Sequence, residues 1–98
     1  MAEPAVKSTH PHDIRVTVRY FAAARAAAGT ESETITVRSG VTVAEVVQGL
    51  AKRNAELSSV LSRCSYLCDG MAVGTEAATV RPVRSGQTID VLPPFAGG

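Results

Sequence analysis

The chain has 98 residues, enough for one small domain. Ten Lys and Arg against nine Asp and Glu give a net charge of +1, and the basic residues are scattered along the chain. This argues against nucleic acid or an anionic membrane as the main partner. A domain of this size leaves little room for a deep cleft with walls on all sides, which favours a carrier, an adaptor or a subunit over a self-sufficient enzyme.

The beginning of the chain differs in composition from the rest. Residues 1–13 contain two prolines and few apolar side chains without a period, so we expect a disordered N-terminal extension. It lacks the layout of a signal peptide, and no apolar stretch of the chain approaches the roughly 20 residues that span a bilayer. The expected compartment is the cytoplasm. His10 and His12 favour no functional metal site, and we expect none in the chain.

Two segments of alternating apolar and polar residues follow. The first runs from Ile14 to Tyr20 and predicts a half-buried strand. Residues 21–28 are rich in alanine and predict a short helix that ends at Gly29, where a positive φ closes the last turn. Residues 33–38 alternate again and predict a second strand, antiparallel to the first.

The clearest helix start lies in the middle of the chain. Thr42 and Glu45 have the spacing of a capping box, in which each side chain bonds to the backbone of the other residue. Residues 43–53 then place their apolar side chains on one face, so this helix should pack across one face of a sheet. We expect Asn54 to end it and residues 56–63 to form another short helical piece.

The last third of the chain reads as short strands and turns. Residues 65–68 predict a third strand, and the Asp69-Gly70 pair is a strong turn signal that leads into residues 71–73, so a hairpin is expected. Residues 74–84 read as a loop. Residues 87–92 predict the final strand, which continues directly into the C-terminal tail.

The two cysteines, Cys64 and Cys68, lie four residues apart. In a strand this spacing is about 13 Å, beyond the roughly 7 Å limit for a disulfide, whereas in a helix the two side chains come close. No second Cys pair or His cluster nearby completes a zinc site. The prediction is therefore two buried structural thiols.

Together these elements predict an α+β domain over residues 14–92, with a mixed sheet and one main helix across one face. A right-handed crossover through that helix would place a later strand parallel to the first. Residues 93–98, which end in Gly97-Gly98, are predicted to form a flexible tail. Its prolines cannot continue a sheet, and its terminal glycines have no side chains to block entry into a narrow channel. On the residues alone, a frayed end remains the alternative.

Several short motifs follow one another along the chain in a specific order and spacing. They are Tyr20-Phe21-Ala22 with Arg25 and Gly29, Thr42-Val43-Ala44-Glu45-Val46, Cys68-Asp69-Gly70, Pro82-Val83-Arg84-Ser85-Gly86 and Leu92-Pro93-Pro94-Phe95-Ala96-Gly97-Gly98. In this order they resemble the small subunit of molybdopterin synthase, a ubiquitin-like sulfur carrier with the β-grasp fold, and the resemblance runs from residue 14 to residue 98. The chain departs from the family in the N-terminal extension, in Cys68 where a Val is usual, and in extra residues around 74–79.

The resemblance implies a sulfur-carrier subunit without a bound cofactor, and not an enzyme. The Gly98 carboxylate would react with ATP on a separate adenylyltransferase of the ubiquitin-activating type. A persulfide or rhodanese-type donor would then convert it to a thiocarboxylate. The large synthase subunit, which supplies the catalytic side chains, would pass the sulfur to a pterin precursor in molybdenum cofactor biosynthesis. Gly97 would give clearance, and residue matching implies partner contacts at Phe21, Arg25, Met71, Ala72, Leu92, Pro93, Pro94 and Phe95.

The same residues also fit other functions. A carrier of the same fold could serve thiamine thiazole or cysteine synthesis. A ubiquitin-like modifier would instead be joined through Gly98 to lysines of other proteins, and the simplest alternative is an interaction domain with an inert terminus. For Arg25 the alternative to partner binding is an ordinary surface ion pair, which contributes little to stability.

Overall fold

The structure, a computed structural model, describes residues 12–94. The predicted tail residues Phe95, Gly97 and Gly98 lie outside this range, as does nearly all of the predicted extension. In chain order the elements are β1 (Asp13–Tyr20), α1 (Ala22–Ala28), β2 (Ser32–Arg38), α2 (Val43–Ala51), α3 (Ala55–Leu61), β3 (Ser65–Cys68), β4 (Met71–Ala72), α4 (Thr75–Val80) and β5 (Thr88–Leu92).

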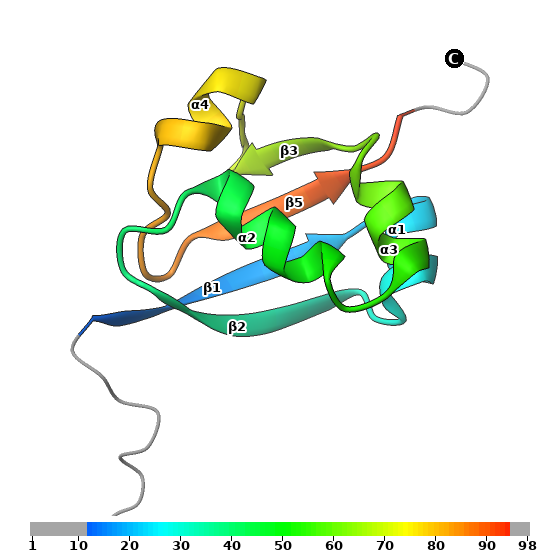
Figure 1. The fold of residues 1–98 in the computed structure, drawn as a ribbon, viewed down its shortest axis with the longest axis horizontal. Coiled ribbons are helices and arrows are strands. Elements are labelled where there is room, and N and C mark those ends of the chain that lie inside the picture. The colour runs from blue at the N-terminus through cyan, green and yellow to red at the C-terminus, as the bar shows by residue number, and fades with distance from the viewer. Residues whose placement is uncertain (1–11, 95–98) are drawn as a thin grey trace, which may run out of the picture.

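The strands form one mixed sheet in the order β2-β1-β5-β3-β4. β1 pairs antiparallel with β2 and parallel with β5, and β3 pairs antiparallel with both β5 and β4. The predicted parallel pairing of a later strand with the first is therefore confirmed. The last strand lies in the middle of the sheet, so the chain leaves the fold from a central strand (Figure 1).

The helices cover one face of this sheet, with α2 lying across β1 and β5 (Figure 1). The predicted capping box of α2 is present, since Glu45 N donates to Thr42 Oγ1 at 3.2 Å and Thr42 N donates to Glu45 Oε1 at 2.9 Å. The buried stripe of α2 packs on the inward side chains of the strands. The fully buried members of this core include Val16, Val18, Tyr20, Val43, Leu57, Cys68, Ile89 and Val91. The α+β class and the β-grasp arrangement are confirmed.

Most element boundaries lie within one or two residues of the predicted ones, and one predicted loop contains a helix. β1 begins at Asp13, one residue before the predicted start. α2 ends at Ala51, and Asn54 does not end it as predicted. Asn54 instead caps the N-terminus of α3, where its side chain accepts a hydrogen bond from Leu57 N at 2.6 Å. The predicted loop over residues 74–84 contains the six-residue helix α4, whose alanines pack against the core. The domain thus has several short helices, of which α2 is the longest.

The predicted hairpin after β3 is confirmed. Asp69 and Gly70 have φ values of 51° and 83°, the left-handed conformation that a two-residue hairpin turn requires. The two cysteines are both free, with Cys64 directly before β3 and Cys68 its last residue. Cys68 is buried as predicted, whereas Cys64 is only half-buried and donates to Val60 O at 3.2 Å. Burial raises the pKa of both thiols, so neither is an activated nucleophile.

Two kinds of feature are missing from residues 12–94. None of the helices there has the length and hydropathy needed to cross a membrane. Within the same range, no three His, Cys, Asp or Glu side chains are grouped so that they could hold a metal ion.

Candidate functional site

The base of the C-terminal tail lies between the end of β1 and the start of β3. β5 ends at Leu92, directly opposite Ser65, and Phe21 N donates to Val91 O at 3.2 Å. Pro93 is half-buried and Pro94 is exposed. Because proline has no N–H to donate to a neighbouring strand, the pairing of β5 in the sheet ends before Pro93.

The sheet face opposite the helices, which we call the open face, carries a continuous row of side chains near the end of β5. We call the end of β5 at Leu92, with Pro93 and Pro94, the tail exit. Residues opposite each other in neighbouring strands point to the same face, and successive residues alternate between faces. Since Tyr20 and Val91 belong to the core, Arg19 and Asp90 point to the open face. The register extends this row across all strands as Ser32, Arg19, Asp90, Leu67 and Ala72. Leu92 and Phe21 flank it on the side of the tail.

Arg19 and Asp90 form a two-pronged ion pair in this row. Arg19 Nε lies 2.6 Å from Asp90 Oδ1, and Nη2 lies 2.8 Å from Oδ2. The Arg19 side chain remains 53% exposed while that of Asp90 is 8% exposed, so the arginine covers the carboxylate. The hydrogen bond and the charge of Asp90 raise the pKa of Arg19. The guanidinium carbon also lies 5.8 Å from the centre of the Phe21 ring.

Sequence reasoning missed this ion pair. The two residues are 71 positions apart and meet only because β1 and β5 are parallel neighbours. The one available signal is Asp90 itself, an acid between the buried Ile89 and Val91 in the last strand.

Phe21 and Arg25 lie together at one end of the open face. Phe21 precedes α1 and is 40% exposed, and Ala22 after it has a φ of 52°, which turns the chain sharply out of β1. Arg25 Nη2 lies 2.8 Å from Glu31 Oε2, and both side chains are mostly exposed, so Arg25 does form the surface ion pair considered as its alternative role. The region encloses a hollow of about 250 Å³ lined by Arg19, Tyr20, Phe21, Ala22, Arg25, Glu31 and Ser32.

The remaining predicted contact residues are placed less uniformly. Ala72 is exposed on the open face, opposite Leu67. Met71 lies opposite the buried Cys68, so it points to the other side of the edge strand, where its side chain is 65% exposed. The structure therefore brings Phe21, Arg25, Leu92 and the prolines together around the tail exit, with Ala72 farther along the same face and Met71 outside this group.

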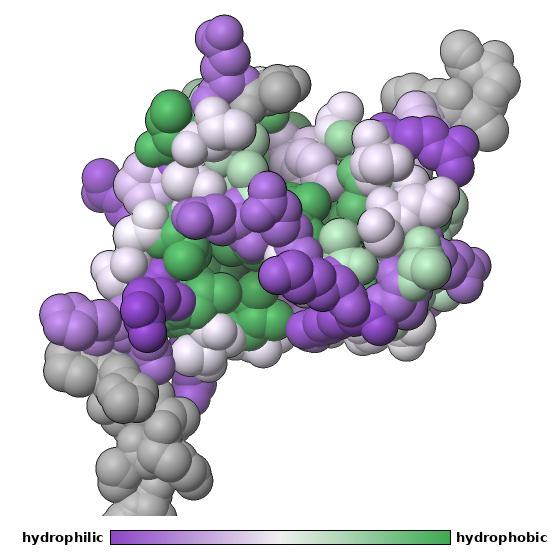
Figure 2. Space-filling view, in the orientation of Figure 1, coloured by the Kyte–Doolittle hydropathy of each residue, from purple (hydrophilic) through white to green (hydrophobic). Residues whose placement is uncertain are grey.

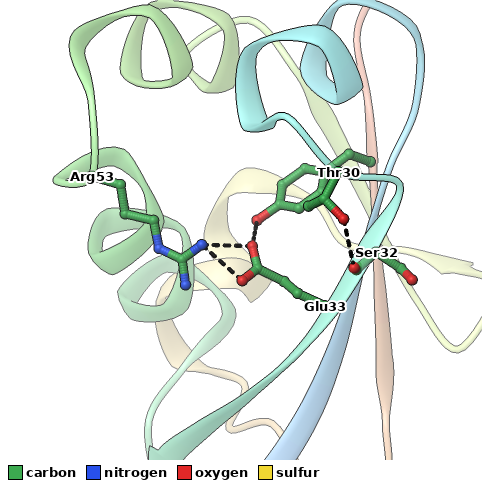
Figure 3. Close-up of polar contacts among 5 residues, drawn as sticks. Thr30, Ser32, Glu33 and Arg53 are labelled. Atoms are coloured by element: carbon green, nitrogen blue, oxygen red, sulfur yellow. Dashed lines mark hydrogen bonds and ion pairs between the residues drawn. The ribbon is translucent and has the colours of Figure 1, made fainter.

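A different polar cluster lies on the helix-covered side. Tyr20 Oη donates to Glu33 Oε2 at 2.6 Å. Arg53 Nη1 donates to Glu33 Oε1 at 2.8 Å and to Oε2 at 2.6 Å (Figure 3). Burial alone would raise the pKa of Glu33, but the bonds from Arg53 and Tyr20 outweigh it and lower that pKa. Burial and the Glu33 carboxylate raise the pKa of Tyr20. This cluster ties β1, β2 and the segment after α2 together, which is a structural task.

The helix-covered side also shows apolar surface between its helices. Figure 2 shows green patches beside α2, bordered by purple polar side chains. A hollow of about 420 Å³ lies there, lined by residues of α2, the end of α3, β3 and α4. Cys64 is a lining residue whose raised pKa keeps the thiol protonated at neutral pH, so the hollow holds no activated nucleophile.

Residues 18–98 match the model of the ThiS family. No curated protein matches the chain. The Haloferax volcanii HVO 2177 protein is similar in structure, with a TM-score of 0.80, 22% identity and coverage of 100% of this chain and 99% of that one. Small archaeal modifier protein 1 from Methanosarcina acetivorans has a TM-score of 0.73 and 24% identity over 89% and 99% of the two chains. A chain in the complex of subunits 1 and 2 of molybdopterin-converting factor from Helicobacter pylori 26695 has a TM-score of 0.64 and 21% identity over 87% and 100%.

Proposed function

The chain belongs to the ThiS family, and from this premise we propose that it is the sulfur-carrier subunit of a molybdopterin synthase. In this role the Gly98 carboxylate is adenylated, converted to a thiocarboxylate, and presented to the large subunit, which transfers the sulfur to a pterin precursor. The observation that carries the proposal is the position of β5. The strand that precedes the tail lies in the middle of the sheet and ends between Phe21 and Ser65.

The chain itself contributes a nucleophile, the Gly98 carboxylate, and a surface to which partner enzymes bind. An α-carboxylate is ionised at neutral pH and needs no base before it attacks the α-phosphate of ATP with loss of pyrophosphate. The resulting acyl-adenylate is open to attack by sulfur with loss of AMP, so a difficult substitution becomes two easier ones. Both steps need side chains from partner enzymes. Gly97 and Gly98 leave room for the tail in a narrow partner channel.

The open face supports docking of those partners. Phe21 and Leu92 offer apolar surface directly at the tail exit, and Ala72 extends the row toward the sheet edge. A partner that binds this face also holds the base of the tail in a defined place. The Helicobacter pylori complex of subunits 1 and 2 supports a large subunit as one such partner.

The direct test is mass spectrometry of the full-length chain after incubation with its activating enzyme, ATP and a sulfur donor. Replacement of one oxygen by sulfur should add about 16 Da, and a chain that lacks Gly98 should gain nothing. Co-purification with the large synthase subunit then distinguishes this role from a carrier for thiamine thiazole or cysteine synthesis. No mass change with the cognate activating enzyme would rule out the carrier function.

The similarity to small archaeal modifier protein 1 favours one further candidate, a modifier joined through Gly98 to lysines of other proteins. That function leaves Gly-Gly remnants on target lysines after proteolysis. Their presence in cells that express the intact chain, and their absence when Gly98 is deleted, would support the modifier. If deletion of Gly98 leaves every cellular phenotype unchanged, the terminus is inert and the domain acts through its surface alone.

A further inference from the structure

Two arginines border the hollow of about 250 Å³ beside Phe21, and each is held from one side by a carboxylate. Asp90 holds Arg19, and Glu31 holds Arg25. The two carboxylates differ in burial. The Asp90 side chain is 8% exposed, with both oxygens engaged by Arg19, whereas the Glu31 side chain is 72% exposed. Asp90 therefore stays bound to Arg19, whereas another acceptor can displace Glu31 from Arg25.

Arg19 has donors to spare. Its Nε and Nη2 atoms bind Asp90, while Nη1 makes no hydrogen bond to any of residues 12–94. The guanidinium plane is fixed by two bonds to Asp90 and by the neighbouring Phe21 ring. Little side-chain entropy is lost when such a pre-oriented arginine binds a further acceptor.

We propose that Arg19 and Arg25 form a two-arginine site at the base of the tail, which binds one carboxylate side chain of the large synthase subunit. The proposal rests on the function proposed above, because that function supplies the partner. Asp90 orients Arg19 from behind without entering the site. Phe21 supplies an apolar wall against which the methylene groups of the incoming acidic residue pack.

A carboxylate fits this site better than a neutral or a basic group. Two guanidinium groups that border one hollow favour negative charge, and Arg–carboxylate pairs gain from the matched geometry of the two groups. The volume of the hollow suits one side chain and not a cofactor, since ligand pockets usually enclose about 300–1,000 Å³. Arg and aromatic residues at the centre of a contact are also the types that contribute most to protein–protein affinity.

The site would give partner specificity that apolar contacts alone lack. A partner without the carboxylate would cover the exposed edge of Arg19 and leave its donors unpaired, which weakens binding. The incoming carboxylate would also displace Glu31 from Arg25. Glu31 therefore acts as a competitor for the site in the free chain.

The test measures the affinity of the full-length chain for the large subunit encoded in the same genome, by isothermal titration calorimetry. The main variant is R19Q/D90N, which replaces the ion pair by two amides, keeps a hydrogen bond between them and leaves no lone buried carboxylate. It should bind about tenfold or more weakly. Its thermal unfolding is measured in parallel, so that loss of fold is recognised.

Arg15 provides the matched control. It lies four residues before Arg19 on the same face of β1, is exposed, and is distant from the hollow in the register. R15Q removes a full charge, whereas R19Q/D90N changes the net charge by zero. R15Q should nevertheless bind within about twofold of the wild type, because a distant exposed charge acts mainly through screened, long-range forces.

Glu31 gives an independent readout. E31Q frees Arg25 from its competitor and should tighten binding by about twofold to fivefold. Weaker binding by E31Q, or R19Q/D90N binding within twofold of the wild type, would overturn the two-arginine site and leave the sulfur-carrier function standing. Failure of the wild type to bind the large subunit would instead reject the proposed synthase function, and this site with it.

Discussion

The two faces of the sheet each carry one strong arginine–carboxylate pair, and the pairs are put to different use. On the helix-covered side, Glu33 binds Arg53 and also accepts the hydroxyl of Tyr20. On the open side, Asp90 binds Arg19, whose guanidinium lies near the ring of Phe21. Both pairs thus combine an acid, an arginine and an aromatic residue, and one pair lies on each face of the sheet.

The difference lies in what each arginine leaves exposed. The Glu33 pair joins β1 and β2 to the segment after α2, so its bonds hold the helical layer against the sheet. The Asp90 pair joins two neighbouring strands that the backbone already holds together, so it adds little to the closure of the sheet. Its arginine instead carries unused donors at the tail exit. The same chemistry therefore stabilises the domain on one face and prepares a binding surface on the other.

The largest effect should come from removing the arginine of the open-face pair. Arg19→Met removes both side-chain hydrogen bonds that the Asp90 carboxylate accepts and places an apolar side chain beside it, with no other side-chain partner among residues 12–94. A carboxylate that lies against apolar groups without a partner is costly, so we expect the thermal unfolding midpoint to fall by about 10 °C near neutral pH. Circular dichroism during heating measures this.

The double variant Arg19→Met/Asp90→Leu is the control for this result. It removes both charges and fills the space with apolar groups, a replacement that is often neutral or stabilising for a buried ion pair. The midpoint should therefore return most of the way to the wild-type value. A double variant no more stable than Arg19→Met alone would show that Asp90 is not what makes the single substitution costly.

The corresponding change on the helix-covered side should have a smaller effect. Arg53→Met leaves Glu33 with the hydrogen bond from Tyr20, and the Glu33 side chain is 22% exposed, so water can solvate it. We expect the midpoint to fall by about 3 °C, as for a partly exposed ion pair. Affinity for the large subunit should not change, since Arg53 lies away from the open face. A loss as large as that of Arg19→Met would contradict the contrast between the two pairs.

The local parts of the fold could be predicted from the sequence, and the pairs of distant residues could not. The capping box at Thr42, the Asp69-Gly70 turn and the alternation of β1 depend on residues within a few positions of one another. Asp90 and Arg19 meet only through a parallel pairing that no local pattern specifies. The short helix α4 was missed because its Thr and Val content favours a loop or a strand, and packing of its alanines decides otherwise.

The candidate site divides in the same way. Phe21, Arg25 and Leu92 were predicted by residue matching, and they do gather at the tail exit. Met71 was predicted with them, but the register of the hairpin points it to the other side of the edge strand. In a sheet, one position along the chain changes the face, so residue matching can predict a segment without predicting which face its side chain occupies. The partner contact at Met71 stays a prediction.

The smallest expected effect is the pH dependence of the helix-covered pair. Arg53 and Tyr20 lower the pKa of Glu33 below its ordinary value of 4.5, so the pair stabilises the fold above that pH. This contribution to stability is lost as the pH falls through the lowered pKa, because Glu33 is then protonated in both the folded and the unfolded chain. Glu33→Gln lacks this contribution, so its midpoint should lie about 2 °C below the wild type at pH 7 and approach it below pH 4.5. The comparison cancels the contributions of all other groups, since both proteins carry them. A gap that widens as the pH falls would mean that the protonated form of Glu33, and not the carboxylate, stabilises the helix-covered side.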